Sequence, residues 1–410
     1  MTLAPLSPTP PRTVVATTGK TRSPHIATLV AAAAVGALAT TMFVPSMPSI
    51  AADLGTSYAA VQFGLSGFLI VTALVQLVSG PMSDVWGRRP VLIWMLVLYL
   101  LGTALCIFAP GIEAFLAGRL LQGAAAAGIV LSRTIIRDLY ERDRAASMIG
   151  YTIMAMAVAP MIGPWLGGVI DEVVGWRGTF VFLGVFGVVT LLAFMVDLTE
   201  TNRTMGRPVA AQIASYRVLL TTPAFWIFTA TGACTGATFY GFLGGAPLVS
   251  SILLEMGPSD YGRWFAFCAA GYMLGNFFSG RFAERVGLGR MVIAGSLVTL
   301  TGPLAMAASF ALDLSHPFSL FGWSVLVGVG NGMVLPSNIA AGVSIRPDAA
   351  GAASGLLGTL QTLAGAGASV IAAWAVGDGT HAVAFSLVIL AFAVGAAFFA
   401  MLSARVLREG

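Results

Sequence analysis

One arginine lies in a part of the sequence where a charged side chain is costly. Arg119 follows Glu113 by six residues and precedes Gln122 by three, in a stretch that is otherwise apolar (FLAGRLLQGAAAAGIV). A carboxyl group can bind and release a proton, whereas a guanidinium group stays charged near neutral pH. These residue types suit proton coupling or attraction of an anion. Gln122, one helical turn from Arg119, can orient it.

The surrounding composition indicates that Arg119 lies in a membrane-crossing helix. Hydrophobic residues make up 57% of the 410-residue chain and charged residues 9%, with a mean hydropathy of +0.89; soluble domains carry about 25% charged residues. Residues 90–109 have no polar face, which excludes a buried helix of a soluble protein, and no alternation of apolar and polar residues points to a barrel. A charge deep in such a helix indicates a functional residue, unless it only reaches outward or bonds backbone carbonyls.

Twelve stretches are long and apolar enough to cross a bilayer, which takes about 20 residues. We therefore predict an all-α membrane protein with twelve transmembrane helices. The predicted spans are 26–48, 58–79, 90–109, 112–134, 145–170, 178–197, 223–250, 261–280, 290–311, 318–342, 351–376 and 381–403.

The basic residues predict the orientation of these spans. All 21 Lys and Arg residues except Arg119, Arg177 and Arg263 fall at or near one side, which the positive-inside rule assigns to the cytoplasm together with both termini. The net charge of +4 then reflects topology, and no nucleic-acid partner is expected. The predicted segments are a disordered tail (1–25), a six-helix half (26–198), a central cytoplasmic loop (199–222), a second six-helix half (223–404) and a tail (405–410).

A short polar phrase occurs twice, half the chain apart. GPMSDVWGRR begins at Gly80 and GRFAERVGLGR at Gly280, each in the inner loop after the second span of a half. An ion pair at the membrane edge can close or release an inner gate, because a partly buried pair is costly to break; the alternative is a solvated loop with positive-inside arginines. The predicted gate residues are Gly80, Asp84, Gly87, Arg88, Arg89, Glu284 and Arg285.

Two other features repeat or cluster in the spans. Pro45, Ser49 and Ile50 of the first span recur as Pro247, Ser251 and Ile252 of the seventh, which also predicts two equivalent halves around a central site, as in secondary transporters. The fifth span contains small and kinking residues that favour a bend at a tightly packed helix pair, although such residues are common in membrane helices generally. They are Pro160, Gly163, Pro164, Gly167 and Gly168.

These phrases resemble signatures of a known family. GPMSDVWGRRPVLI resembles the loop signature of the major facilitator superfamily, RLLQGAAAAG that of proton-linked members in the fourth span, and APMIGPWLGG that of drug exporters in the fifth. RTIIRDLY, GWRGTF and AGAASGLLGTLQ resemble the bicyclomycin-resistance and chloramphenicol-efflux branch. The resemblance implies a multi-pass protein of the bacterial inner membrane that exports small amphipathic drugs, such as phenicols, in exchange for protons. It also implies a monomer that needs no cofactor.

The sequence departs from this branch in the first span. Members usually carry an aspartate there as the proton carrier, whereas ATTMFVPSMPSI has Thr41 at that position, and threonine cannot carry a proton near neutral pH. Glu113 can take the proton while Arg119 responds to its charge. Alternatively, Arg119 attracts an anionic substrate, or the protein is an uncoupled facilitator. A metabolite importer of the same fold is a further alternative.

The predicted cavity consists of polar, aromatic and methionine side chains on spans that line the cavity in this superfamily. They are Thr41, Met42, Phe43, Arg119, Gln122, Met154, Tyr240, Asn331 and Gln361. Flexible and aromatic side chains suit apolar ligands, although in membrane helices they more often pack or face lipid. No cluster of catalytic or metal-ligating residues and no GxxxxGK[ST] loop is present, so neither an enzyme nor an ATP-driven pump is expected.

Overall fold

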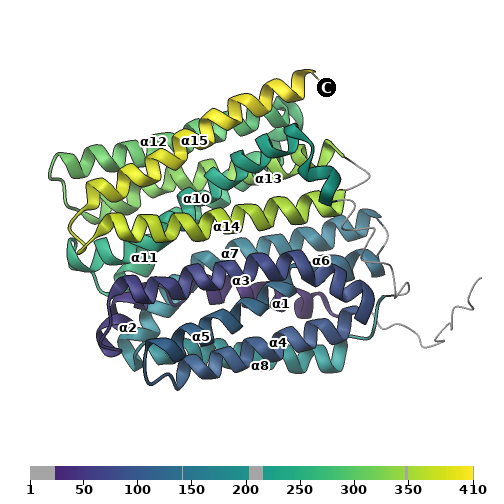
Figure 1. The fold of residues 1–410 in the computed structure, drawn as a ribbon, viewed down its shortest axis with the longest axis horizontal. Helices are drawn as coiled ribbons and strands as arrows, with labels where there is room; N and C mark the ends of the chain where they lie inside the picture. The colour runs from purple at the N-terminus through teal and green to yellow at the C-terminus, as the bar shows by residue number, and fades with distance from the viewer. Residues whose placement is uncertain (1–23, 141, 203–215, 347–349, 410) are drawn as a thin grey trace, which may run out of the picture.

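The computed structural model describes residues 24–140, 142–202, 216–346 and 350–409, and these residues form a bundle of long helices (Figure 1). The predicted all-helical fold is confirmed. The predicted tail 1–25 and central loop 199–222 lie largely outside the described residues. In α7, the side chains of residues 142, 143, 145–147, 149–157, 160 and 161 also lie outside them.

Helices of the first part of the chain follow the predicted order of spans. Two crossings are interrupted by a short 3-10 turn, η1 in the first and η2 in the fourth. The helices are α1 (Ile26–Thr41), η1 (Val44–Ser46), α2 (Met47–Asp53), α3 (Tyr58–Trp86), α4 (Arg88–Ile107), α5 (Ile112–Gln122), η2 (Gly123–Ala125), α6 (Ala126–Leu139), α7 (Arg142–Val174) and α8 (Trp176–Asp197).

The second part repeats this pattern, and its fourth crossing begins with a π-helical turn, η3. The helices are α10 (Pro223–Ile252), α11 (Pro258–Val286), α12 (Leu288–Ala311), η3 (Phe318–Gly322), α13 (Trp323–Ser344), α14 (Ala350–Val376) and α15 (Ala382–Glu409).

Nine of the described helical runs are long and apolar enough to cross a membrane on composition alone. The other long helices, α7, α10 and α11, are not among these nine, and α10 and α11 contain buried glycine and serine residues, with buried threonine in α10. Small residues at such positions let membrane helices approach closely.

The two parts of the chain form two groups of helices that lie side by side (Figure 1). Helices α1 to α8 lie below and α10 to α15 above in that view. The main contacts between the groups are those of α3 with α14 and of α7 with α11. Smaller contacts join η1 and α2 to the second group.

Glycines of the repeated polar phrase join successive helices at one end of the bundle. Gly87 separates α3 from α4 with φ of +97°, and Gly287 separates α11 from α12 with φ of +92°. Glycine adopts such a conformation without steric cost. We call this end of the bundle the inner end, following the predicted orientation, and the opposite end the outer end.

Candidate functional site

Arg119 is fully buried in the last turn of α5. Its Nε donates a hydrogen bond to the Gly64 carbonyl of α3 at 3.2 Å. Its Nη1 donates to the Ala39 carbonyl of α1 at 3.1 Å and to Gln122 Oε1 at 2.6 Å. Three helices of the first group therefore hold the guanidinium group.

Aromatic rings enclose the same guanidinium group. Its Cζ lies 3.9 Å from the ring centre of Phe43, 4.6 Å from that of Phe68 and 6.0 Å from that of Phe180. The face of an aromatic ring attracts a cation, and more strongly where water is excluded. Within the described part of the chain, no carboxylate pairs with Arg119, so rings and carbonyl oxygens stabilise its charge.

Gln122 links this arginine to α4. Its Nε2 donates a hydrogen bond to Thr103 Oγ1 at 2.8 Å, and Thr103 in turn donates to the Tyr99 carbonyl at 2.8 Å. Both Gln122 and Thr103 are buried. The chain of hydrogen bonds fixes the side-chain oxygen that accepts from Arg119, which is the orienting role that the spacing predicts.

Glu113 is in a different environment from the buried Arg119. It is in the first turn of α5, near the outer end, and its side chain is exposed. No hydrogen bond or ion pair between Glu113 and Arg119 occurs among the described residues. The structure therefore does not bring together the two residues expected to couple protons.

The first-span residues pack inside the first group. Thr41, Met42 and Phe43 are all buried. Thr41 lies against Gly163 of α7, where a β-carbon would be 2.7 Å from Thr41 Oγ1, and Gly167 packs against the backbone of Met42. The small residues of the fifth span thus allow α7 to lie directly on α1.

The other face of the same stretch of α7 contacts the second group at the outer end. Gly168 packs against the backbone of Pro258, and Gly262 of α11 packs against Pro164. Glu172 Oε1 accepts a hydrogen bond from the backbone nitrogen of Ser259 at 3.0 Å. We call these contacts between 164–172 of α7 and 258–262 of α11 the outer gate.

A second contact closes the outer end between α3 and α10. The hydroxyl of Tyr58 donates a hydrogen bond to the Gly244 carbonyl at 2.8 Å. Further along α3, Thr359 Oγ1 of α14 donates to the Ala73 carbonyl at 3.3 Å. The two groups therefore touch from the outer end to the middle of the bundle.

The first copy of the polar phrase forms an ion-pair network at the inner end. Arg88 pairs with Asp84 of α3 and, through Nε at 3.1 Å, with Asp138 of α6. Glu200 accepts hydrogen bonds from the backbone nitrogens of Arg88 at 2.9 Å and Arg89 at 3.2 Å. None of these residues belongs to the second group of helices.

The second copy of the polar phrase, which begins at Gly280, lacks such a network among the described residues. Glu284 and Arg285 are exposed at the end of α11, and neither takes part in an ion pair within the described residues. Gly80 and Gly87 lie in the first copy, in α3 and directly after it. Only the first copy therefore provides a charge network here.

Candidate cavity residues of the second group lie around α10. Asn331 is buried and shares a hydrogen bond with Thr238 at 3.3 Å. Gln361 is half-buried against Gly236, and Tyr240 is half-buried against Gly365. The side chains of Met154 and Pro160 lie outside the described residues.

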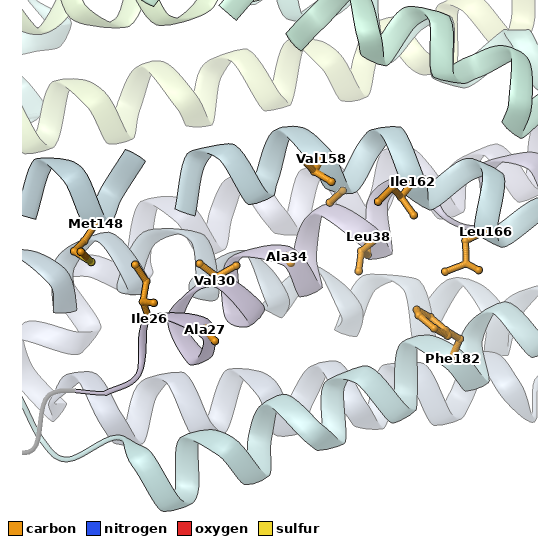
Figure 2. A pocket seen from close by; sticks show the side chains of 11 residues that line it. Ile26, Ala27, Val30, Ala34, Leu38, Met148, Val158, Ile162, Leu166 and Phe182 are labelled. Atoms are coloured by element: carbon orange, nitrogen blue, oxygen red, sulfur yellow. The ribbon is translucent and has the colours of Figure 1, made fainter. Parts of the chain in front are cut away.

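A cavity lies elsewhere, between α1, α7 and α8 (Figure 2). It has a volume of about 590 Å³ and is lined by aliphatic side chains, Met148 and Phe182. No candidate residue named from the sequence lines it. Such an apolar groove gives no polar group that could orient a substrate.

Comparison with known proteins decides the family. Residues 29–369 match the Major Facilitator Superfamily. The chain belongs to this superfamily. It is therefore a multi-pass membrane transporter and not an enzyme.

Named relatives of this superfamily member include drug-resistance proteins. Multidrug resistance protein D of Escherichia coli is 27% identical over 82% of this chain and 84% of its own. A chloramphenicol resistance protein of Pseudomonas aeruginosa is 27% identical over 75% and 72%. A bicyclomycin resistance protein homolog of Haemophilus influenzae is 25% identical over 79% and 82%.

A solved structure of similar fold is the bacterial homolog of the human lysosomal transporter Spinster, in an inward-facing and unoccupied conformation. It matches this superfamily member with a TM-score of 0.78 at 18% identity, over 94% of this chain and 97% of its own. This likeness concerns the fold.

Sequence reasoning missed three polar residues to which the fold of this superfamily member gives specific surroundings. Asn338 donates to the Phe228 carbonyl at 2.9 Å, Asp138 pairs with Arg88, and Asp171 is buried at the outer end of α7. Asp138 and Asp171 fall at the edges of predicted spans, where an acid is usually solvated. Only their neighbours in space distinguish them from exposed residues.

Proposed function

We propose that this protein exports small, uncharged amphipathic compounds of the phenicol type from the bacterial cell, in exchange for protons. The named relatives support a drug as cargo, because resistance to chloramphenicol and bicyclomycin stands in their names. The signature-like stretch of the fifth span, which contacts α1 on one face and α11 on the other, supports alternating access through the outer gate.

The surroundings of Arg119 are the reason for proposing an uncharged substrate and not an anion. Its charge is directed to carbonyl oxygens, to Gln122 and to aromatic rings, and the side chain is fully buried. Nη2 of Arg119 has no hydrogen-bond partner among the described residues, but it is buried. An anionic substrate that used the other two guanidinium nitrogens would have to break hydrogen bonds to a charged group, each worth about 1.5–3 kcal/mol. We assign Arg119 to positioning the helices of the first group.

Neutral polar groups of the second group suit such a cargo. Gln361 and Tyr240 are half-buried on neighbouring helices, and the Oδ1 of Asn338 has no hydrogen-bond partner among the described residues. Sparse polar groups among apolar side chains orient an amphipathic ligand without charge.

The test is uptake of labelled chloramphenicol into everted membrane vesicles with and without an acid-inside pH gradient. Accumulation above the outside concentration that needs the gradient supports the proposal. Vesicles with a Gly168→Leu variant are the matched control, because leucine at this position blocks closure of the outer gate. Uptake equal to that of vesicles lacking the protein contradicts the proposed cargo.

A further inference from the structure

Asp171 is the only acidic residue among the described ones whose side chain is buried, with 9% of its surface exposed. It lies in the last turn of α7, one residue beyond the predicted end of the fifth span. Its Oδ2 accepts a hydrogen bond from Ser49 Oγ of α2 at 2.9 Å. It is therefore a titratable group held inside the outer gate.

No cation neutralises this carboxylate in the described part of the protein. The adjacent residue, Glu172, has the same charge and accepts a hydrogen bond from Ser259 across the gate. The cation Arg177 pairs instead with Asp53 of α2, at 2.6 Å. On α11, Arg263 is exposed and paired with Asp260.

The gate around Asp171 joins equivalent parts of the two halves. A small cavity of about 100 Å³ is lined by Pro45 and Ser49 of the first half and by Pro247 and Ser251 of the second. These are the residues that repeat in the sequence. Ser49 thus touches Asp171 on one side and this shared cavity on the other, so that opening the halves admits water beside the carboxyl group.

We propose that Asp171 is a proton-binding residue of the outer gate, which takes up a proton from the outside while the gate is open and holds it once the gate has closed. This inference deepens the proposed proton exchange and rests on it. It assigns a proton site that the sequence, with Thr41 in the first span, does not provide.

The physical reason is the cost of a buried charge. A carboxylate removed from water without a cation is strongly disfavoured, whereas the neutral carboxyl group needs only hydrogen-bond partners. Asp171 therefore binds a proton more tightly in the closed gate than in the open one. Protonation stabilises the closed gate at low pH, and this stabilisation is lost as the pH rises. Acid outside the cell then returns the carrier to the state closed on the outside.

The test measures the gate itself in the full-length protein. Spin labels are placed at the exposed residues Val174 of α7 and Leu312 after α12, in a background without the three native cysteines, and their distance distribution is recorded at acid and alkaline pH. In the otherwise unchanged protein, the ratio of closed to open gates should fall at least about threefold as the pH rises. In Asp171→Asn, it should stay high and nearly constant.

Glu172→Gln is the matched control, since it neutralises the adjacent acid and keeps an oxygen that accepts from Ser259. It should retain the pH dependence. Ser49→Ala provides a second test that keeps the carboxyl group: without the Ser49 hydrogen bond the ionised form loses a donor, so the transition should move to higher pH.

An unchanged pH dependence in Asp171→Asn overturns the inference, as does its loss in Glu172→Gln alone or an unmoved transition in Ser49→Ala. The measurement contains no substrate. A pH-dependent gate in a protein that does not transport chloramphenicol would reject the proposed cargo and keep the role of Asp171. Gradient-driven chloramphenicol transport by a protein whose gate does not respond to pH would keep the proposed cargo and reject the role of Asp171.

Discussion

Arg119 donates a hydrogen bond to Gln122 Oε1 at 2.6 Å, deep inside the first group of helices. The two residues lie on one face of α5, and Gln122 is held in turn by Thr103. A cation enclosed in this way connects α1, α3, α4 and α5. Its substitution should therefore affect how these helices move as a unit.

The first prediction concerns Gln122. Gln122→Leu removes the acceptor of Arg119 and leaves a charged donor buried without its partner, which costs about 1–3 kcal/mol. The melting temperature should fall and transport should drop at least about tenfold. Thermal unfolding of the purified protein and vesicle uptake check this.

Leu120→Met is the control for Gln122→Leu, because Leu120 is a neighbour on α5 that is 44% exposed and the substitution keeps an apolar side chain at membrane depth. It should change both quantities little. Equal losses in the two variants would show that α5 tolerates no substitution, and would remove the support for the Arg119–Gln122 bond.

A second prediction concerns Thr41 and Gly163. Gly163→Ala places a β-carbon 2.7 Å from Thr41 Oγ1, and such overpacking costs about 1–3 kcal/mol. Thr41→Ala removes the hydroxyl group and should restore most of the lost stability in the double variant. Unfolding of both single variants and the double variant measures the coupling, and purely additive losses would contradict the contact.

The outer gate gives a third prediction. Gly168→Ala brings a β-carbon against the backbone of Pro258, which cannot turn aside as a side chain can. The variant should favour the state that is open on the outside. Labels at Val174 and Leu312 should show a longer distance than in the parent protein. Gly175→Ala tests whether the effect is specific, because nothing lies within 4 Å of a β-carbon there, although its φ of +82° favours glycine.

The fourth prediction compares the two copies of the polar phrase. Arg88→Ala leaves Asp84 and Asp138 without their shared partner, so transport should fall about tenfold or more, since breaking such a partly buried network costs more than losing a surface pair. Arg285→Ala removes an exposed arginine and should have little effect. Vesicle uptake by the two variants compares them directly, and equal losses would contradict the difference.

The helices were predictable from the sequence because their apolar length does not depend on the tertiary fold. The repeat at Gly80 and Gly280 also predicted two similar sets of helices, since each copy supplies a glycine with positive φ between successive helices. Gln122 was predictable as a partner of Arg119 because residues three apart on a helix are neighbours.

The surroundings of the acids were not predictable. Asp171 and Glu113 both lie near the outer end in the sequence, yet Asp171 is buried under α2 and Glu113 is exposed. Burial depends on which helix from a distant part of the chain covers a residue. The sequence contains no local signal for Ser49 lying on Asp171.

The central claim, that cargo leaves in exchange for protons, is tested most directly in proteoliposomes that contain the purified protein and a trapped pH indicator. A gradient of chloramphenicol is imposed without a pH gradient. The account predicts a pH change inside the vesicles, with protons moving against the direction of the drug, and no such change for the Gly168→Leu variant. Movement of the drug to equilibrium without any pH change would contradict it and would identify a facilitator.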